Sequence, residues 1–156
     1  MKIEGNGPLS PQELRAIQEK SLEILVYFKE FCQKHGLLFY FCGGCCIGAI
    51  RHKGFIPWDD DIDVFMPRKD YERLAQLWPK EADPQYAYCR SDKGHYLRSL
   101  LSAISDENTT FIKERQQDLD ISHGIRLEIL PLDGCPESRF ARKRQILWAL
   151  IYSMFN

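Results

Sequence analysis

The chain has 156 residues, of which 44% are hydrophobic and 28% are charged. This is the length and composition of one ordinary globular domain, which excludes a disordered tail, a collagen-like fibre and a polytopic membrane protein. Lysine and arginine together number 21 and the acidic residues 22, so the formal net charge is −1. We therefore expect no binding of nucleic acid through bulk charge, and any phosphate must be recognised by a local cluster.

The N-terminus is a long predicted helix over residues 11–35. Ser10 can cap this helix, Pro11 suits its first position, and Glu13 completes a capping box. Gly36 follows two basic residues and is expected to end the helix. The apolar residues that recur at helical spacing and predict its buried face are Leu14, Ile17, Leu25, Phe28 and Phe31.

Shorter elements follow this helix and are separated by glycines and prolines. The expected strands cover residues 37–42, 61–66, 86–89, 97–105 and 124–130, and the later helices cover residues 45–51, 68–77 and 137 onward. Pro67 and Pro131 are expected to end the strands that precede them. Without a repeat or an obvious linker, these elements predict a single domain of mixed α and β order over residues 1–156.

Six cysteines are present, and the polar N-terminus has no apolar segment of the kind found in signal peptides. We therefore expect free, mostly buried thiols in a cytoplasmic protein rather than a disulfide framework. The C-x-x-C spacing of Cys42 and Cys45 has no second such pair, which disfavours a structural zinc site. No run of about 20 apolar residues predicts a membrane span.

Residues 137–156 combine a basic start with a strongly apolar helix. Arg139, Arg142, Lys143 and Arg144 precede an apolar run that extends from residue 146 to residue 152. A helix this apolar requires a partner that covers it. We favour a core helix whose partners are missing or belong to another chain, which would make an oligomer. The alternative is a peripheral helix at the inner face of the membrane.

Four carboxylates lie within five residues, at Asp59, Asp60, Asp61 and Asp63. Alternation along a strand places Asp61 and Asp63 on one face, about 6–7 Å apart at about 3.3 Å per residue. Their mutual repulsion is relieved by a divalent cation between them, which predicts a metal site. Asp59 has the same parity but precedes the strand, whereas Asp60 is expected to point away.

Glu128 is a single carboxylate between apolar residues of a later predicted strand. An outward-facing glutamate on an edge strand would explain it without any function. Because burial of an unpaired carboxylate is unfavourable, we prefer Glu128 as a third metal ligand beside Asp61 and Asp63.

A glycine pair and a basic triplet complete the candidate site. Gly43 and Gly44 follow the first predicted strand, where glycine lets the backbone approach a phosphate at the start of a helix. Arg51, His52 and Lys53 lie between the glycines and the carboxylates and can neutralise phosphate charge. A capping role for His52 at the short helix is an equally good interpretation. The arrangement predicts metal-dependent phosphoryl or nucleotidyl transfer.

These stretches resemble the signature of the LicD family, which contains bacterial phosphorylcholine transferases and, more distantly, fukutin and fukutin-related protein. The resemblance extends from about Leu14 to Asp133 and is carried by residues 43–63, 66–71 and 124–133. It implies an α+β fold with a mixed, nucleotidyltransferase-like sheet flanked by helices and preceded by a long N-terminal helix. Family members usually continue well past this length, which indicates a C-terminally truncated chain.

The resemblance implies transfer of phosphocholine from CDP-choline to a sugar hydroxyl of a cell-surface glycan or its lipid-linked precursor, as in lipopolysaccharide or teichoic acid synthesis. The implied catalytic and metal-binding residues are Asp61, Asp63 and Glu128, with Mg²⁺ or Mn²⁺ as the cofactor. The implied phosphate-binding residues are Gly43, Gly44, Arg51, His52 and Lys53. One of the carboxylates, or Asp59, would accept the proton of the acceptor hydroxyl.

Two residues depart from the family pattern. Cys45 stands where the family usually has threonine, and because a thiol is a poor donor to phosphate, we expect altered nucleotide binding. Glu128 stands where aspartate is commoner, and its longer side chain is expected to change the metal geometry. Two other functions stay open: transfer of a nucleoside monophosphate to a small molecule, and nucleotide or metal binding without turnover.

Overall fold

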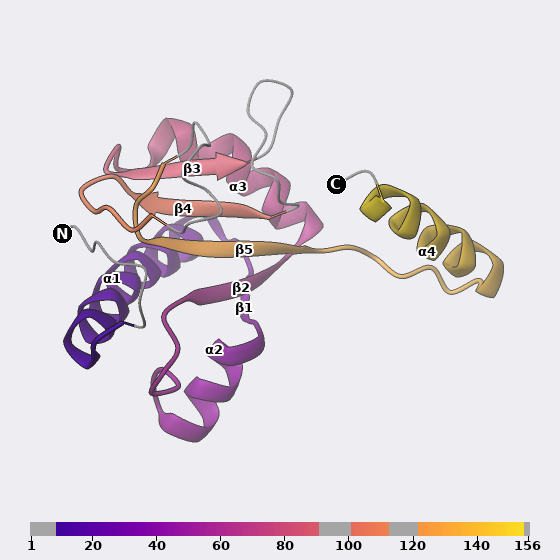
Figure 1. Ribbon diagram of the computed structural model, residues 1–156. Coiled ribbons are helices and arrows are strands. Elements are labelled where there is room, and N and C mark those ends of the chain that lie inside the picture. The colour runs from indigo at the N-terminus through magenta and orange to yellow at the C-terminus, as the bar shows by residue number, and fades with distance from the viewer. Residues whose placement is uncertain (1–8, 91–100, 113–121, 155–156) are drawn as a thin grey trace.

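The computed structural model describes residues 9–90, 101–112 and 122–154. The elements follow the order α1 (Pro11–His35), β1 (Tyr40–Phe41), α2 (Gly43–Ile47), η1 (Gly48–His52), β2 (Ile62–Pro67), α3 (Arg68–Glu81), β3 (Tyr86–Arg90), β4 (Ser102–Asp106), β5 (Arg126–Leu132) and α4 (Arg139–Met154). In the described ranges, helices and one mixed sheet make up the fold, and the expected α+β class is confirmed (Figure 1).

The sheet has the strand order β1-β2-β5-β4-β3. β2 and β5 run parallel at its centre, and the other neighbouring strands are antiparallel. α1 and α3 pack against one face, where alternate residues of β2 are fully buried. Asp63 and Phe65 alternate with those core residues and therefore lie on the other face. The core residues of the two central strands are Ile62, Val64, Met66, Leu127 and Ile129.

α1 has the predicted boundaries, because local chemistry determines both ends. Ser10 accepts a hydrogen bond from the Glu13 amide at its side chain (3.3 Å), and the Glu13 carboxylate accepts one from the Ser10 amide (2.8 Å). Gly36 adopts the left-handed conformation (φ 62°) and closes the C-terminus. Ile17, Ile24 and Phe28 are fully buried on the apolar face.

Two strand predictions differ from the structure. Of the predicted strand 37–42, β1 covers only Tyr40–Phe41, and the Leu38 amide donates to the Asp70 carboxylate (3.2 Å) rather than to a neighbouring strand. Pro131 was expected to end a strand, but β5 continues to Leu132. Pro131 and Leu132 remain in register with Met66 and Pro67 of β2, which extends the parallel pair beyond the expected end. Residues 97–100 of another predicted strand lie outside the described ranges.

The cysteines are all free, as expected, but they are less buried than expected. Cys32 is buried, Cys46 and Cys135 are exposed, and the other three are partly buried. The prediction of mostly buried thiols is therefore wrong, because Cys45 and Cys46 lie on the short helix α2, Cys42 is its N-cap, and Cys135 lies in the connection between β5 and α4.

α4 stands to one side of the sheet, after an extended connection from β5 (Figure 1). It contains no buried residue, and Phe140, Trp148 and Met154 are all more than 60% exposed. Ala149 and Tyr152 line a cavity of about 570 Å³ that also reaches Phe65 and Leu130. None of the helices in the described ranges has the length and apolar character needed to span a bilayer.

Candidate functional site

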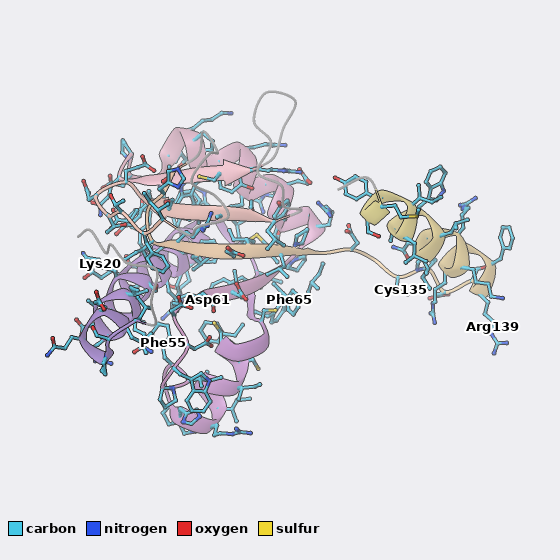
Figure 2. All side chains as sticks on the ribbon, viewed as in Figure 1. Lys20, Phe55, Asp61, Phe65, Cys135 and Arg139 are labelled. Atoms are coloured by element: carbon cyan, nitrogen blue, oxygen red, sulfur yellow. The ribbon has the colours of Figure 1, made fainter. Side chains whose placement is uncertain are left out.

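The first part of the site is the acid loop, defined as Asp59, Asp60 and Asp61. Each of these partly buried residues offers a carboxylate oxygen, and the three oxygens lie within 4.8 Å of one another. β2 begins only at Ile62, so strand alternation does not govern the acid loop. The expectation that Asp60 points away is therefore wrong. Figure 2 shows Asp61 near the start of β2, above the loop that carries Phe55.

The second part is the pair formed by Asp63 and Glu128. These residues are Cα partners in the parallel register of β2 and β5, and neighbouring strands lie about 4.8 Å apart. Both are partly buried on the face opposite the helices. Arg126 places its Nε 3.6 Å from the Glu128 carboxylate. β5 lies between β2 and β4, so the interpretation of Glu128 as an edge-strand residue is wrong.

These carboxylates satisfy the chemistry of a hard divalent cation, which prefers several oxygen ligands. Among the described residues, the group with metal-like spacing is the acid loop, and it does not include Asp63 or Glu128. Burial and then the charges of Asp61 and Asp60 raise the pKa of Asp59. Smaller contributions to this rise come from repulsion between the negative charges of the acid loop, which a bound cation would relieve.

The glycine pair lies directly against the acid loop. Gly43 has φ 48°, a left-handed conformation that favours glycine. A Cβ atom on Gly44 would lie 2.5 Å from the Asp59 carboxylate oxygen Oδ2. The structure thus gives Gly44 a definite reason to be glycine, because a site carboxylate leaves no room for a Cβ atom. The predicted contact with phosphate remains a prediction.

Cys45 is bonded to the backbone on both sides of Ile62. Its sulfur accepts a hydrogen bond from the Asp63 amide (3.2 Å), and its thiol is 3.7 Å from the Asp61 carbonyl oxygen, to which it donates. Burial raises the pKa of Cys45 to about 11, with a further contribution from the Asp63 charge. The thiol is therefore protonated at neutral pH and donates to the backbone of Asp61 in the acid loop.

Of the basic triplet, Lys53 lines a cavity that also includes a carboxylate of the site. Arg51 and His52 are exposed at the end of η1, and the His52 side chain makes no capping hydrogen bond within the described residues. Lys53 has φ 57° and lines a cavity of about 440 Å³ that also touches Gly44 and Asp59. Lys53 is thus the member of the triplet that lines the same cavity as Asp59.

Gln18 is a residue of the site that sequence reasoning missed. Its side-chain amide donates to the Asp59 carbonyl oxygen (2.9 Å), and the residue is only 7% exposed. The signal was available in the sequence, because Gln18 falls four residues after Leu14 and seven before Leu25, within the apolar stripe of α1. A glutamine in that position has to find a buried hydrogen-bond partner.

Comparison with known protein families shows the family to which this chain belongs. Residues 36–123 match the sequence model of the LicD/FKTN/FKRP family, nucleotidyltransferase domain. The match covers more than half of the chain and includes β1, α2, η1, the acid loop and β2. This chain belongs to that family. Glu128 lies outside the matched residues, and its place beside Asp63 comes from the strand register.

Among curated proteins, the lipopolysaccharide cholinephosphotransferase LicD of Haemophilus influenzae is 49% identical over 73 residues, which are 47% of this chain and 28% of that protein. An uncharacterised protein of Rickettsia prowazekii is 31% identical over 72 residues, 44% of this chain and 27% of that protein. The matched segment therefore spans about a quarter of the length of these relatives. No solved structure matches the chain.

Proposed function

We propose that this LicD-family chain transfers phosphocholine from CDP-choline to a hydroxyl group of a cell-surface glycan or its lipid-linked precursor, with Mg²⁺ or Mn²⁺. The observation that carries the proposal is the pairing of Asp63, two residues after Asp61 of the acid loop, with Glu128 on the neighbouring strand β5. The choline substrate class rests on the likeness to the Haemophilus influenzae protein, whose name states that it is a cholinephosphotransferase.

In this proposal, the acceptor oxygen attacks the phosphorus atom that carries choline. The phosphoanhydride bond breaks, CMP leaves, and one carboxylate of the site accepts the hydroxyl proton. Asp61, Asp63 and Glu128 would hold the metal, which when bound supplies charge neutralisation and orients the reacting oxygens. Gly43 and Gly44 would let the backbone approach the diphosphate. Lys53, together with Arg51 and His52, would neutralise its remaining charge.

The products of the reaction test the proposal. We expect the protein to release CMP from CDP-choline in the presence of Mg²⁺ and a glycan acceptor. Asp61→Asn and Asp63→Asn should each lower the rate by at least about 10²-fold, because each removes a charged oxygen from the proposed metal site. Full activity in both variants would contradict the assignment of the carboxylates.

One other reaction is favoured by a specific finding, because the matched family model describes a nucleotidyltransferase domain. Transfer of a nucleoside monophosphate to a small molecule would release pyrophosphate from a nucleoside triphosphate. A parallel assay with CTP therefore separates the two reactions. Pyrophosphate release from CTP, without CMP release from CDP-choline, would replace the first proposal with the second.

A further inference from the structure

Cys45 joins the glycine turn to the metal-binding segment through a single sulfur atom. That atom accepts from the Asp63 amide and donates to the Asp61 carbonyl. Both partners are backbone groups of Asp61 and Asp63, two of the three residues whose carboxylates are proposed to bind the cation. A sulfur that bridges peptide groups two residues apart constrains the backbone between them. This backbone determines the distance between the Asp61 and Asp63 side chains.

The same segment is held from two other elements. The Cys42 amide donates to the Asp63 carbonyl oxygen (3.0 Å), and Gln18 on α1 binds the Asp59 carbonyl. These contacts hold the ends of the segment from Asp59 to Asp63. Cys45 binds the Asp61 carbonyl and the Asp63 amide, where the chain changes from the acid loop to β2.

We propose that Cys45 is a positioning residue, whose side chain fixes the backbone between Asp61 and Asp63 so that both carboxylates are preorganised for a divalent cation. The inference rests on the proposed function, because it concerns the same metal site. It assigns Cys45 no contact with phosphate or metal. The hydrogen-bonding capacity of its thiol is used by the two peptide groups.

A hydroxyl group can make the same two hydrogen bonds, whereas a methyl group cannot. Cys45→Thr and Cys45→Val have nearly the same shape and differ only in that group, so they form a matched pair. Cys46→Val is the site control, because Cys46 is exposed one residue further along α2. Cys45→Ala removes the same two bonds without added bulk and replaces Cys45→Val if that variant fails to fold.

The experiment measures Mn²⁺ binding to the full chain by electron paramagnetic resonance. We expect Cys45→Val to weaken Mn²⁺ binding by at least about tenfold, the loss typical when a residue that orients metal ligands is removed. Cys45→Thr and Cys46→Val should bind Mn²⁺ as the wild type does. Amide hydrogen exchange at Asp63 should accelerate in Cys45→Val and stay slow in Cys45→Thr.

The outcomes separate the inference from the proposed function. Wild-type Mn²⁺ affinity in Cys45→Val, with binding abolished in Asp63→Asn, would overturn the role of Cys45 and leave the metal site standing. Wild-type protein that binds no Mn²⁺ would overturn the metal site, and with it the functional part of this inference. Unchanged exchange at Asp63 in Cys45→Val would overturn the positioning role in either case.

Discussion

At the scale of single residues, the Asp59 carboxylate occupies the space that a side chain at position 44 would need. Sequence reasoning assigned Gly44 to phosphate binding because a glycine pair precedes a short helix. The structure adds a reason that could not be predicted, since the approach of Asp59 depends on how the loop of residues 53–61 folds back. A substitution at Gly44 is therefore expected to alter the position of the Asp59 carboxylate.

We predict that Gly44→Ala displaces Asp59 and lowers the free energy of unfolding by about 1–3 kcal/mol, the usual effect of overpacking. The reason is the 2.5 Å that would separate the new Cβ from the carboxylate oxygen Oδ2. Gly54→Ala is the matched control, because a Cβ there meets nothing within 4 Å. Urea denaturation of the two variants measures the difference. Equal stability of the two variants would show that the Asp59 carboxylate leaves room for a Cβ at position 44.

At the scale of elements, the features that depend on local sequence patterns were predicted correctly. The capping box and Gly36 gave the boundaries of α1, and alternation placed Asp63 on the face opposite the core. Alternation did not apply to Asp61, because β2 starts one residue later. The pairing of Asp63 with Glu128 could not be predicted, because the register of β2 and β5 depends on packing between segments 65 residues apart in the chain.

Another long-range contact joins α3 to the end of β5. Arg68 at the start of α3 donates from Nε and Nη2 to both carboxylate oxygens of Asp133, each at 2.7 Å. These hydrogen bonds hold the pKa of Asp133 below its usual range. A carboxylate whose pKa is lowered in the folded state stabilises the protein above its unfolded pKa, and loses that contribution as the pH falls through its folded pKa.

We therefore predict that the stability difference between wild type and Asp133→Asn is largest above about pH 4 and shrinks as the pH falls further, since aspartate in an unfolded chain has a pKa of about 3.9. Urea denaturation midpoints from pH 7 to pH 2.5 measure this dependence. Glu30→Gln is a control on the exposed face of α1. A constant difference between wild type and Asp133→Asn at all pH values would show that the ion pair contributes nothing.

At the scale of the whole molecule, α4 is a helix with no buried residue. Its large apolar side chains are mostly exposed, with Leu147 at 56% and Trp148 at 64%. The sequence predicted an apolar helix that needs a partner, and the structure shows this helix with no buried residue. Exposed apolar patches of this kind mark interaction surfaces.

We expect the purified chain to self-associate through α4, and Trp148→Glu to shift it toward monomer. Sedimentation velocity at increasing protein concentration measures the change. Trp58→Glu is the matched control, because Trp58 is 77% exposed but lies far along the chain from α4. A wild-type chain that stays monomeric at every concentration would contradict this prediction.

The most direct test of the central claim is a thermal melt with CDP-choline and Mg²⁺, comparing wild type with Asp63→Asn. A ligand that binds only the folded state raises the melting temperature, and a ligand concentration 100 times its Kd adds about 2.7 kcal/mol of stability. We predict a rise that requires Mg²⁺ in the wild type and is absent in Asp63→Asn. An equal rise in both proteins, or none with any cytidine nucleotide, would contradict a nucleotide site on these carboxylates.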